Sequence, residues 1–295
     1  MSLIASLWGL TTAVIDRVMR HSQMARSSQF AYVAFLASIP FAFVLISIIG
    51  LVASPAAYSS LIDKARGTIP DQLADFLDDL LQSASSSTGQ SITFLVLGLL
   101  IGVWLAGNVA GAVTDGLDDA FERPHRPWLR GKARAILTAI ITALVFVVAT
   151  LLSVVGPPVL QWVAEEVGAG QATQVLVQVA VALAGAAIFW AYLVLLYRYA
   201  PNDAHGRTRH ALPGAVVGVI GWIIVASLFR LYVDNFGSYN RVYGSLGVVV
   251  IFLVFLYLTG LTILIGGETT AELAERDAGD GTDGASAVTG TAGPR

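Results

Sequence analysis

The chain of 295 residues contains no cysteine, and only 13% of its residues are charged. Without cysteine there are no disulfides, thiolate metal sites, iron–sulfur clusters or cysteine nucleophiles. The formal charge of −3 gives no net basic field, so we expect no nucleic-acid partner. Instead, 56% of the residues are hydrophobic, which is more apolar surface than one soluble core can bury. We therefore expect membrane lipids to surround the protein.

Six apolar segments are long enough to cross a bilayer as helices. About 30 Å of hydrocarbon requires roughly 20 apolar residues, because each backbone polar group must be satisfied within its own segment. The segments are Phe30–Ala53, Ser91–Val113, Ala135–Gly156, Gln174–Tyr199, Leu212–Tyr232 and Ser245–Gly267. The pattern predicts an all-α, polytopic membrane helix bundle with six transmembrane helices.

The loop charges predict the orientation of this bundle. Most of the 17 Lys and Arg residues fall on one side, where cytoplasmic loops concentrate basic residues. They are Arg17, Arg20, Arg26, Arg123, Arg126, Arg130, Lys132, Arg134, Arg198, Arg207, Arg209, Arg276 and Arg295. The opposite side holds Lys64, Arg66, Arg230 and Arg241, together with an aspartate-rich first loop. Both termini are therefore predicted to be cytoplasmic.

The chain divides into three parts. Residues 1–28 are predicted to form an amphipathic cytoplasmic segment, and we expect no cleavable signal peptide because no basic segment precedes its apolar residues. Its leucines and valines recur at helical spacing, which fits a helix in the headgroup layer or a helix packed on the bundle. Residues 29–273 form the six-helix domain, with a helical outer loop at about 54–90. Residues 274–295 lack periodicity and predict a disordered tail.

Small and polar residues inside the segments mark candidate contacts. Glycines at helical spacing predict close helix packing, at Gly107 and Gly111 and again at Gly214, Gly218 and Gly221. Polar side chains in a bilayer are costly and face a bundle interior or its mouth. Asn108, Asp115 and Glu268 are such residues, and they fit either ion pairs that fix helix ends or a transport path. Arg198 and the basic loop before Ala135 are the expected partners of the two carboxylates.

The turn Tyr232–Gly244 interleaves aromatic rings with Asn, Asp and Arg. It fits either a rigid interfacial turn or the outer mouth of a cavity, since aromatic rings favour the membrane interface. The second interpretation gives a candidate path or cavity across the bundle. Its residues are Arg230, Asn235, Tyr239, Tyr243, Tyr32, Asn108, Asp115 and Glu268.

No enzymatic machinery is expected. Ser245 lies between glycines, but a serine nucleophile needs a nearby base, and all four histidines fall on the predicted cytoplasmic side. No His and carboxylate cluster has metal-ligand spacing. We predict no catalytic residues, no metal and no cofactor.

Several of these stretches together resemble one known family. They are Phe30–Tyr32 through Ser38–Phe41, the turn Tyr232–Gly244, and Tyr243–Gly247 leading to Gly267–Leu273. The resemblance is to the YihY/BrkB family of bacterial inner-membrane proteins and covers about residues 29–273. Asp118 and Asp119 stand where the family has more neutral or basic residues, and Thr270 stands where the family often has Asn. The resemblance implies six membrane helices, a name linked to virulence and an old ribonuclease BN label.

Two functions follow as hypotheses. The first is a transporter or flippase-like protein that moves a small polar solute or an envelope lipid. Three plus three helices would give halves of opposite orientation, although the halves share no matching sequence. The alternative is a non-transporting membrane scaffold that organises the cell envelope, in which the glycine faces would matter more than the interior polar residues. Both are compatible with a monomer or a homo-oligomer.

Overall fold

The protein is described from a computed structural model that covers residues 3–52, 88–124, 127–145, 148, 171–202, 208–236 and 240–289. The helices are α1 (Leu3–Arg20), α2 (Gln23–Val52), α5 (Thr88–Ala120), α7 (Gln171–Tyr199), α8 (Thr208–Phe236) and α9 (Asn240–Thr289). Residues 128–145 are also helical. Within these ranges there is no strand, so the all-α prediction is confirmed for the described part of the chain.

Four helical stretches are long and apolar enough to cross a membrane. They are Leu100–Ala120, Val179–Tyr199, Arg209–Tyr232 and Val249–Ala278. Each overlaps one of the six predicted segments. Of the other two, Phe30–Ala53 falls almost entirely within α2, and Ala135–Gly156 lies partly outside the described residues, as does nearly all of the predicted outer loop at 54–90. The count of six therefore stays a prediction.

Two boundaries differ from those expected from the sequence. The first membrane-segment helix begins at Gln23 rather than after residue 28, because the chain turns at Ser22, whose φ is 53°. At the other end, α9 continues to Thr289 where a disordered tail was expected from residue 274. Side-chain bonds hold the start of this extension, since Arg276 bonds Glu272 and the Gly9 carbonyl.

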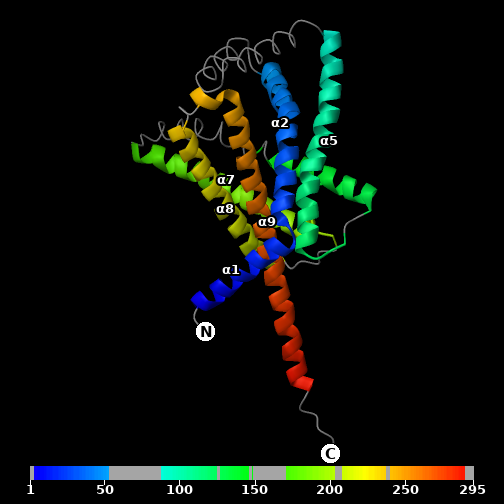
Figure 1. The fold of residues 1–295 in the computed structure, drawn as a ribbon, viewed down its shortest axis with the longest axis vertical. Helices are drawn as coiled ribbons and strands as arrows, with labels where there is room; N and C mark the ends of the chain where they lie inside the picture. The colour runs from blue at the N-terminus through cyan, green and yellow to red at the C-terminus, as the bar shows by residue number, and fades with distance from the viewer. Residues whose placement is uncertain are drawn as a thin grey trace, which may run out of the picture.

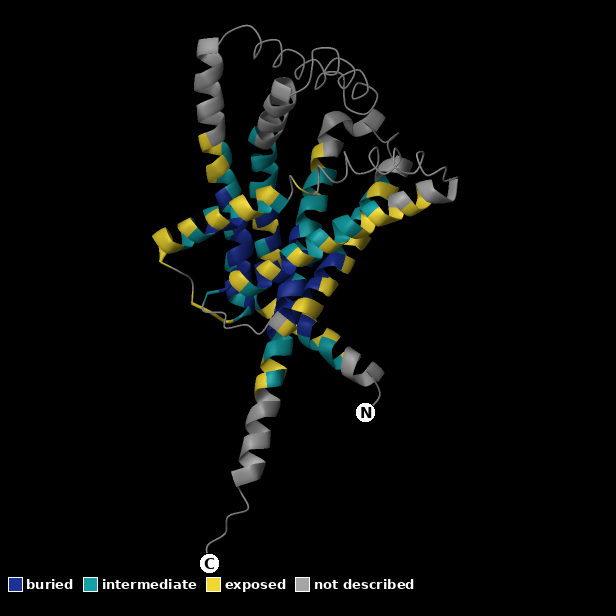
Figure 2. Ribbon diagram, turned by 180° about the vertical axis from the view of Figure 1, so that it is seen from behind, coloured by how far each residue is buried: buried dark blue, intermediate teal, exposed yellow. Residues whose placement is uncertain are grey.

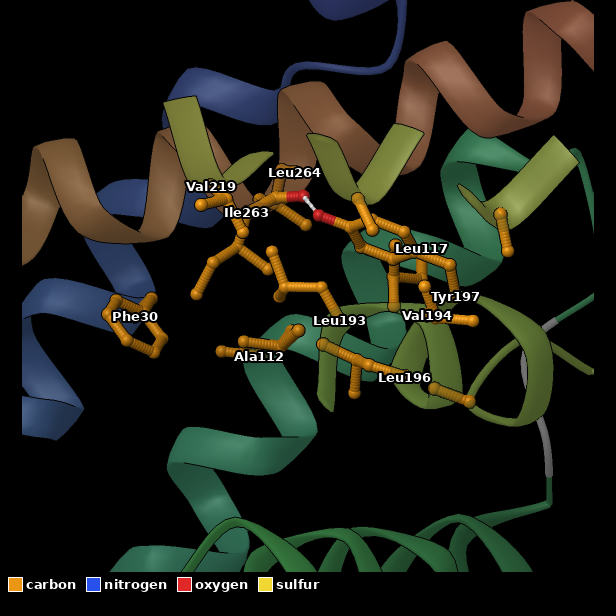
Figure 3. Close-up of a cluster of buried hydrophobic side chains, with 14 residues drawn as sticks. Phe30, Ala112, Leu117, Leu193, Val194, Leu196, Tyr197, Val219, Ile263 and Leu264 are labelled. Carbon is orange, nitrogen blue, oxygen red and sulfur yellow. Dashed lines mark hydrogen bonds between the residues drawn. The ribbon is translucent and has the colours of Figure 1, made fainter. Parts of the chain in front are cut away.

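The helices converge at one end of the bundle. Figure 1 shows α1 crossing beneath α2 and α9, and the last turns of α9 leaving the bundle at that same end. We call this the α1 end. The buried residues gather there, whereas the outer faces of α7 and α8 are largely exposed (Figure 2). The core joins α2, α5, α7, α8 and α9, and Tyr197 at its centre donates a hydrogen bond to the Ile263 carbonyl (Figure 3).

Glycines set the closest helix crossing, between α8 and α9. A Cβ added at Gly214 would lie 2.6 Å from the Gly266 carbonyl oxygen, and one at Gly218 would lie 2.8 Å from the Tyr197 hydroxyl. Small residues permit such approach of helix backbones in lipid. The second predicted face, Gly107 and Gly111, lies against Ile136 and Ala135. The packing interpretation of both glycine faces is confirmed.

Helix α1 packs on the bundle. Its inner face buries Val14, Arg17 and Val18, whereas Trp8, Ile15 and Met19 are exposed on the opposite face. Residues spaced by seven and four lie on one side of a helix, so these exposed residues form a single apolar strip. Of the two interpretations of this segment, packing on the bundle is confirmed, and the strip remains available to the headgroup layer.

The glycine crossing makes a direct stability prediction. We expect Gly214→Ala to destabilise the protein by about 1–3 kcal/mol, because overfilling a tight contact forces backbone shifts. Gly185→Ala is the matched control, since nothing lies within 4 Å of its Cβ position. Thermal unfolding of each purified variant in lipid nanodiscs measures the difference. Equal melting temperatures for both variants would contradict the tight α8–α9 contact.

Candidate functional site

A buried ion pair joins the first helix to the last. The Arg17 Nε atom donates to Glu268 Oε2 over 3.1 Å, and the side chains are 2% and 0% exposed. The local sequence positions both groups. Arg17 sits between Val14 and Val18 on the buried face of α1, while Glu268 follows Gly267, whose missing side chain leaves room for Leu117.

The rest of the Arg17 guanidinium contacts two more groups. One terminal nitrogen donates to Glu275 at 2.7 Å, and the other donates to the Ala120 carbonyl at 2.6 Å. Ala120 is the last residue of α5, where the helix dipole favours a cation. Burial alone would lower the pKa of Arg17, but its bonds to Glu275 and Glu268 outweigh this effect and raise the pKa. The guanidinium therefore stays charged and ties α1, α5 and α9 together.

The second oxygen of Glu268 faces the turn between α1 and α2. Gln23 Nε2 donates to Glu268 Oε1 at 2.7 Å and also to the Gly116 carbonyl at 2.9 Å. His21 Nδ1 lies 2.7 Å from the same oxygen Oε1. Both oxygens of this buried carboxylate are thus bonded, as a buried charge requires. We call Arg17, His21, Gln23 and Glu268 the buried charge cluster.

Gly116 of α5 leaves space for the side chains beside the cluster. A Cβ at this position would lie 2.7 Å from a methyl group of Leu264 and 3.1 Å from Gln23 Oε1. A side chain here would therefore press on Leu264 and Gln23. The Gln23 Oε1 atom is buried and accepts no hydrogen bond from the part of the chain that the structure describes.

Two aspartates that depart from the family pattern support the cluster from α5. Arg26 pairs with Asp119 at 2.8 Å, which fixes the start of α2 against the end of α5. Asp118 is buried and accepts a hydrogen bond from the Asn202 amide at 2.6 Å. The two acidic residues therefore have bonding partners within this chain.

The structure brings only Glu268 of the predicted path into the buried charge cluster. Asp115 is half-buried on α5, and Asn108 accepts a hydrogen bond from Lys132 at 2.5 Å. Tyr32 is 63% exposed and Arg230 is also exposed. Tyr239 and the side chains of Asn235 and Tyr243 lie outside the described residues. The path as a whole stays a prediction.

Sequence reasoning missed the partners of Glu268. It expected Arg198 or the basic loop, whereas the ion pair is made by Arg17, and the Arg198 guanidinium lies over the Tyr199 ring at 5.1 Å. One signal was present. Arg17 falls on the same helical face as Val14 and Val18, so burying these valines also buries the arginine.

No metal centre is evident in the described ranges. Among these residues, no three His, Asp or Glu side chains are placed to hold an ion. The buried charge cluster holds only one histidine and one carboxylate within bonding distance of each other. The groups of the cluster make ion pairs and hydrogen bonds with one another.

The family model described as virulence factor BrkB matches residues 14–290, which include the whole buried charge cluster. The chain belongs to the BrkB family. It is 44% identical over 81 residues to the ribonuclease-like protein YfkH of Bacillus subtilis, covering 28% of this chain and 29% of that protein. It is 39% identical over 101 residues to UPF0761 membrane proteins of Xanthomonas campestris and Xanthomonas oryzae, covering 34% of this chain and 24% of each relative.

The BrkB-family chain therefore aligns with less than a third of the length of each of these relatives. No solved structure matches it. Of these names, that of the Bacillus relative suggests an activity, whereas those of the Xanthomonas relatives say only that they are membrane proteins.

The buried ion pair predicts that removing Arg17 lowers the stability of the protein far more than removing an exposed arginine does. We expect Arg17→Met to destabilise the protein by roughly 3–5 kcal/mol, because the Glu268 carboxylate would stay buried without its counter-ion. Arg209→Met is the control, since the Arg209–Asp277 pair is largely exposed and such pairs contribute about 0–1 kcal/mol. Thermal unfolding in nanodiscs compares the two.

A second substitution checks the cause. Adding Glu268→Leu to Arg17→Met should recover part of the lost stability, because no buried charge is then left unpaired. If the double variant is no more stable than Arg17→Met, the loss comes from packing and not from the ion pair.

Proposed function

We propose that this BrkB-family protein is a multi-pass plasma-membrane transporter or flippase-like protein for a small polar solute or an envelope lipid. The observation that carries the proposal is that ionisable side chains are buried in the bundle while large apolar side chains are exposed on its surface. The interior of the helix bundle holds Arg17, Asp118 and Glu268 in buried positions, while its outer surface is rich in exposed leucine, isoleucine and valine. Ionisable groups inside membrane bundles are candidate functional positions, because burying them in a bilayer is costly.

The membrane placement rests on the four apolar helices and on loop charge. We propose six spans with both termini in the cytoplasm, because basic residues concentrate on one side. The position of α1 and of the last turns of α9 at one end of the bundle supports termini on the same side (Figure 1). This arrangement places the buried charge cluster at the cytoplasmic end.

The alternative is a non-transporting scaffold for the cell envelope. It predicts that small-residue faces such as Gly214 and Gly218 matter while the interior polar residues do not. Gly214 and Gly218 are buried against α9 and Tyr197 within the same chain, so they support the packing of this fold under either function. Substitutions at Asn108 and Glu268 therefore distinguish the two functions.

We also propose that the protein is not an enzyme. The ribonuclease-like name belongs to a relative of which 29% aligns. Phosphodiester hydrolysis at a metal centre needs several His or carboxylate ligands around the ion. The cluster offers one His21–Glu268 contact and an arginine, which suits an ion pair better than a metal site.

Native mass spectrometry of the protein in its own lipid tests the proposal. The variant combines Asn108→Leu with Glu268→Gln, and Arg209→Gln is a surface control. We expect a bound lipid or polar metabolite in the wild type and the control. Its occupancy should fall roughly tenfold in the double variant, because charge-assisted hydrogen bonds contribute about 1.5–3 kcal/mol.

The outcomes separate the two functions. A ligand retained equally by all three proteins would reject the path through Asn108 and Glu268. Co-purified proteins with no bound lipid or metabolite would reject transport and favour the scaffold. The melting temperature of each sample is measured first, so that loss of ligand is not loss of fold.

A further inference from the structure

We propose that His21 and Glu268 form a proton-binding site that is reached from solvent past Glu122, and that the proton is the coupling ion of this protein. The coupling role rests on the proposed transport function, whereas the proton site does not. Three side chains form a line from the surface inwards. Glu122 is 58% exposed, His21 is 13% exposed and Glu268 is 0% exposed.

The imidazole of His21 bridges the two carboxylates. Its Nε2 atom lies 3.7 Å from Glu122 Oε1, and its Nδ1 atom lies 2.7 Å from Glu268 Oε1. The two nitrogens of one ring can receive and release a proton on opposite sides. Glu122 therefore stands where it can collect protons for a carboxylate that solvent does not reach.

Carboxylates outnumber the positive groups bonded to them around Arg17. Arg17 faces three carboxylates, Glu268, Glu272 and Glu275, of which only Glu272 is also bonded to Arg276. With Glu122 included, negative groups exceed the positive ones. A proton bound by the pair of His21 and Glu268 reduces this excess.

The other groups near the cluster are already engaged. On α2, Arg26 pairs with Asp119, and on α5, Asp118 bonds the Asn202 amide. Other titratable groups on the neighbouring helices are half-buried Asp115 on α5, Tyr197 on α7, which donates to the Ile263 carbonyl, and His210 on α8, which lies beside Asp277. Of the groups that bond Glu268, His21 alone can deliver a proton, since Arg17 stays charged and Gln23 does not titrate.

Backbone strain gives independent support. Glu122 has φ 51°, and it ends α5 where the Arg123 amide bonds the Asp118 carbonyl and the Glu122 amide bonds the Asp119 carbonyl. This helix ending usually places glycine at the left-handed position. A side chain there costs roughly 1 kcal/mol, and such strain tends to occur at functional positions. Glu122, whose carboxylate faces His21, shares this backbone conformation with Ser22, the residue that follows His21.

The transfer itself is balanced. A hydronium ion gives a proton to His21 Nε2 and leaves as water, while the Nδ1–H bond breaks and that proton bonds to Glu268 Oε1. The imidazole ends neutral in its other tautomer, and Glu268 ends as a neutral carboxylic acid. Rotation of the Gln23 amide would then offer the unbonded Oε1 as an acceptor for the new hydroxyl.

Protonation has a structural consequence at Arg17. A neutral Glu268 no longer forms an ion pair with the guanidinium, which keeps its contacts to Glu275 and the Ala120 carbonyl. The bond between α1 and this turn of α9 weakens. Proton binding thus changes how firmly the cytoplasmic end is closed, which is what coupling requires.

Infrared spectroscopy of the full-length protein in nanodiscs tests the proton site without a transported substrate. Lowering the pH from about 8 to about 5, the range in which imidazoles change charge, should produce the carbonyl band of a buried carboxylic acid. We expect the band in wild type and in Glu275→Gln, which removes another carboxylate bonded to Arg17. The band should be absent in Glu268→Gln. An unchanged band in Glu268→Gln overturns the site.

Two further variants keep the test decisive if Glu268→Gln fails to fold. Glu122→Gly suits the left-handed backbone, and His21→Asn removes the imidazole. After a pH jump, the band should appear roughly 100-fold more slowly in His21→Asn, because a positioned acid–base group contributes about that factor or more. In Glu122→Gly it should also appear more slowly than in wild type. Wild-type kinetics in both variants overturn the relay.

Coupling is read separately, from the occupancy of the lipid or metabolite found by native mass spectrometry at the two pH values. Occupancy that depends on pH in wild type and not in Glu268→Gln supports proton coupling. Occupancy that ignores pH in both rejects coupling and leaves transport standing. If no lipid or metabolite is bound at all, the transport proposal and the coupling fail together, and the infrared band still decides the proton site.

Discussion

The guanidinium of Arg17 occupies the point where the first helix, the end of α5 and the last helix meet. It neutralises Glu268, donates a hydrogen bond to Glu275 and donates another to the carbonyl of Ala120, the last residue of α5. Arg17 and Glu268 are buried, so water cannot replace a lost partner of either group. Helices α1 and α9, which lie at opposite ends of the sequence, are therefore bonded to each other at this point. Gly116 lies against Leu264 and Gln23 at the same place.

Lipid explains why so much polarity lies inside and so little outside. Exposed apolar side chains cost nothing against hydrocarbon, and association of helices must come from close packing and polar bonds. The protein uses the two in different places. Close packing joins α8 to α9 through Gly214, and polar bonds join α1, α2 and α5 to α9 through Arg17 and Gln23. The family to which the chain belongs is a family of membrane proteins, which fits this division.

The sequence predicted the helices and the glycine faces because both depend on local periodicity and residue size. Glu268 was also found, since a carboxylate in an apolar segment is conspicuous. Its partners were not, because Arg17 and His21 lie about 250 residues away in a segment with an ordinary amphipathic pattern. Long-range pairing is decided by how helices pack, and charge rules for loops carry no such information. The extension of α9 to Thr289 was missed because composition alone favoured a tail.

The α8–α9 crossing has a mechanical consequence. The backbones of α8 and α9 approach closely at Gly214 and Gly266, and Tyr197 packs beside them. Sliding one helix along the other would bring these atoms into steric overlap, so the two helices resist relative movement. Interfaces held by side-chain bonds can exchange partners at much lower cost. The contacts of α1 and α2 with α9 through Arg17 and Gln23 are of this second kind, so this end of the bundle resists rearrangement less than the α8–α9 crossing does.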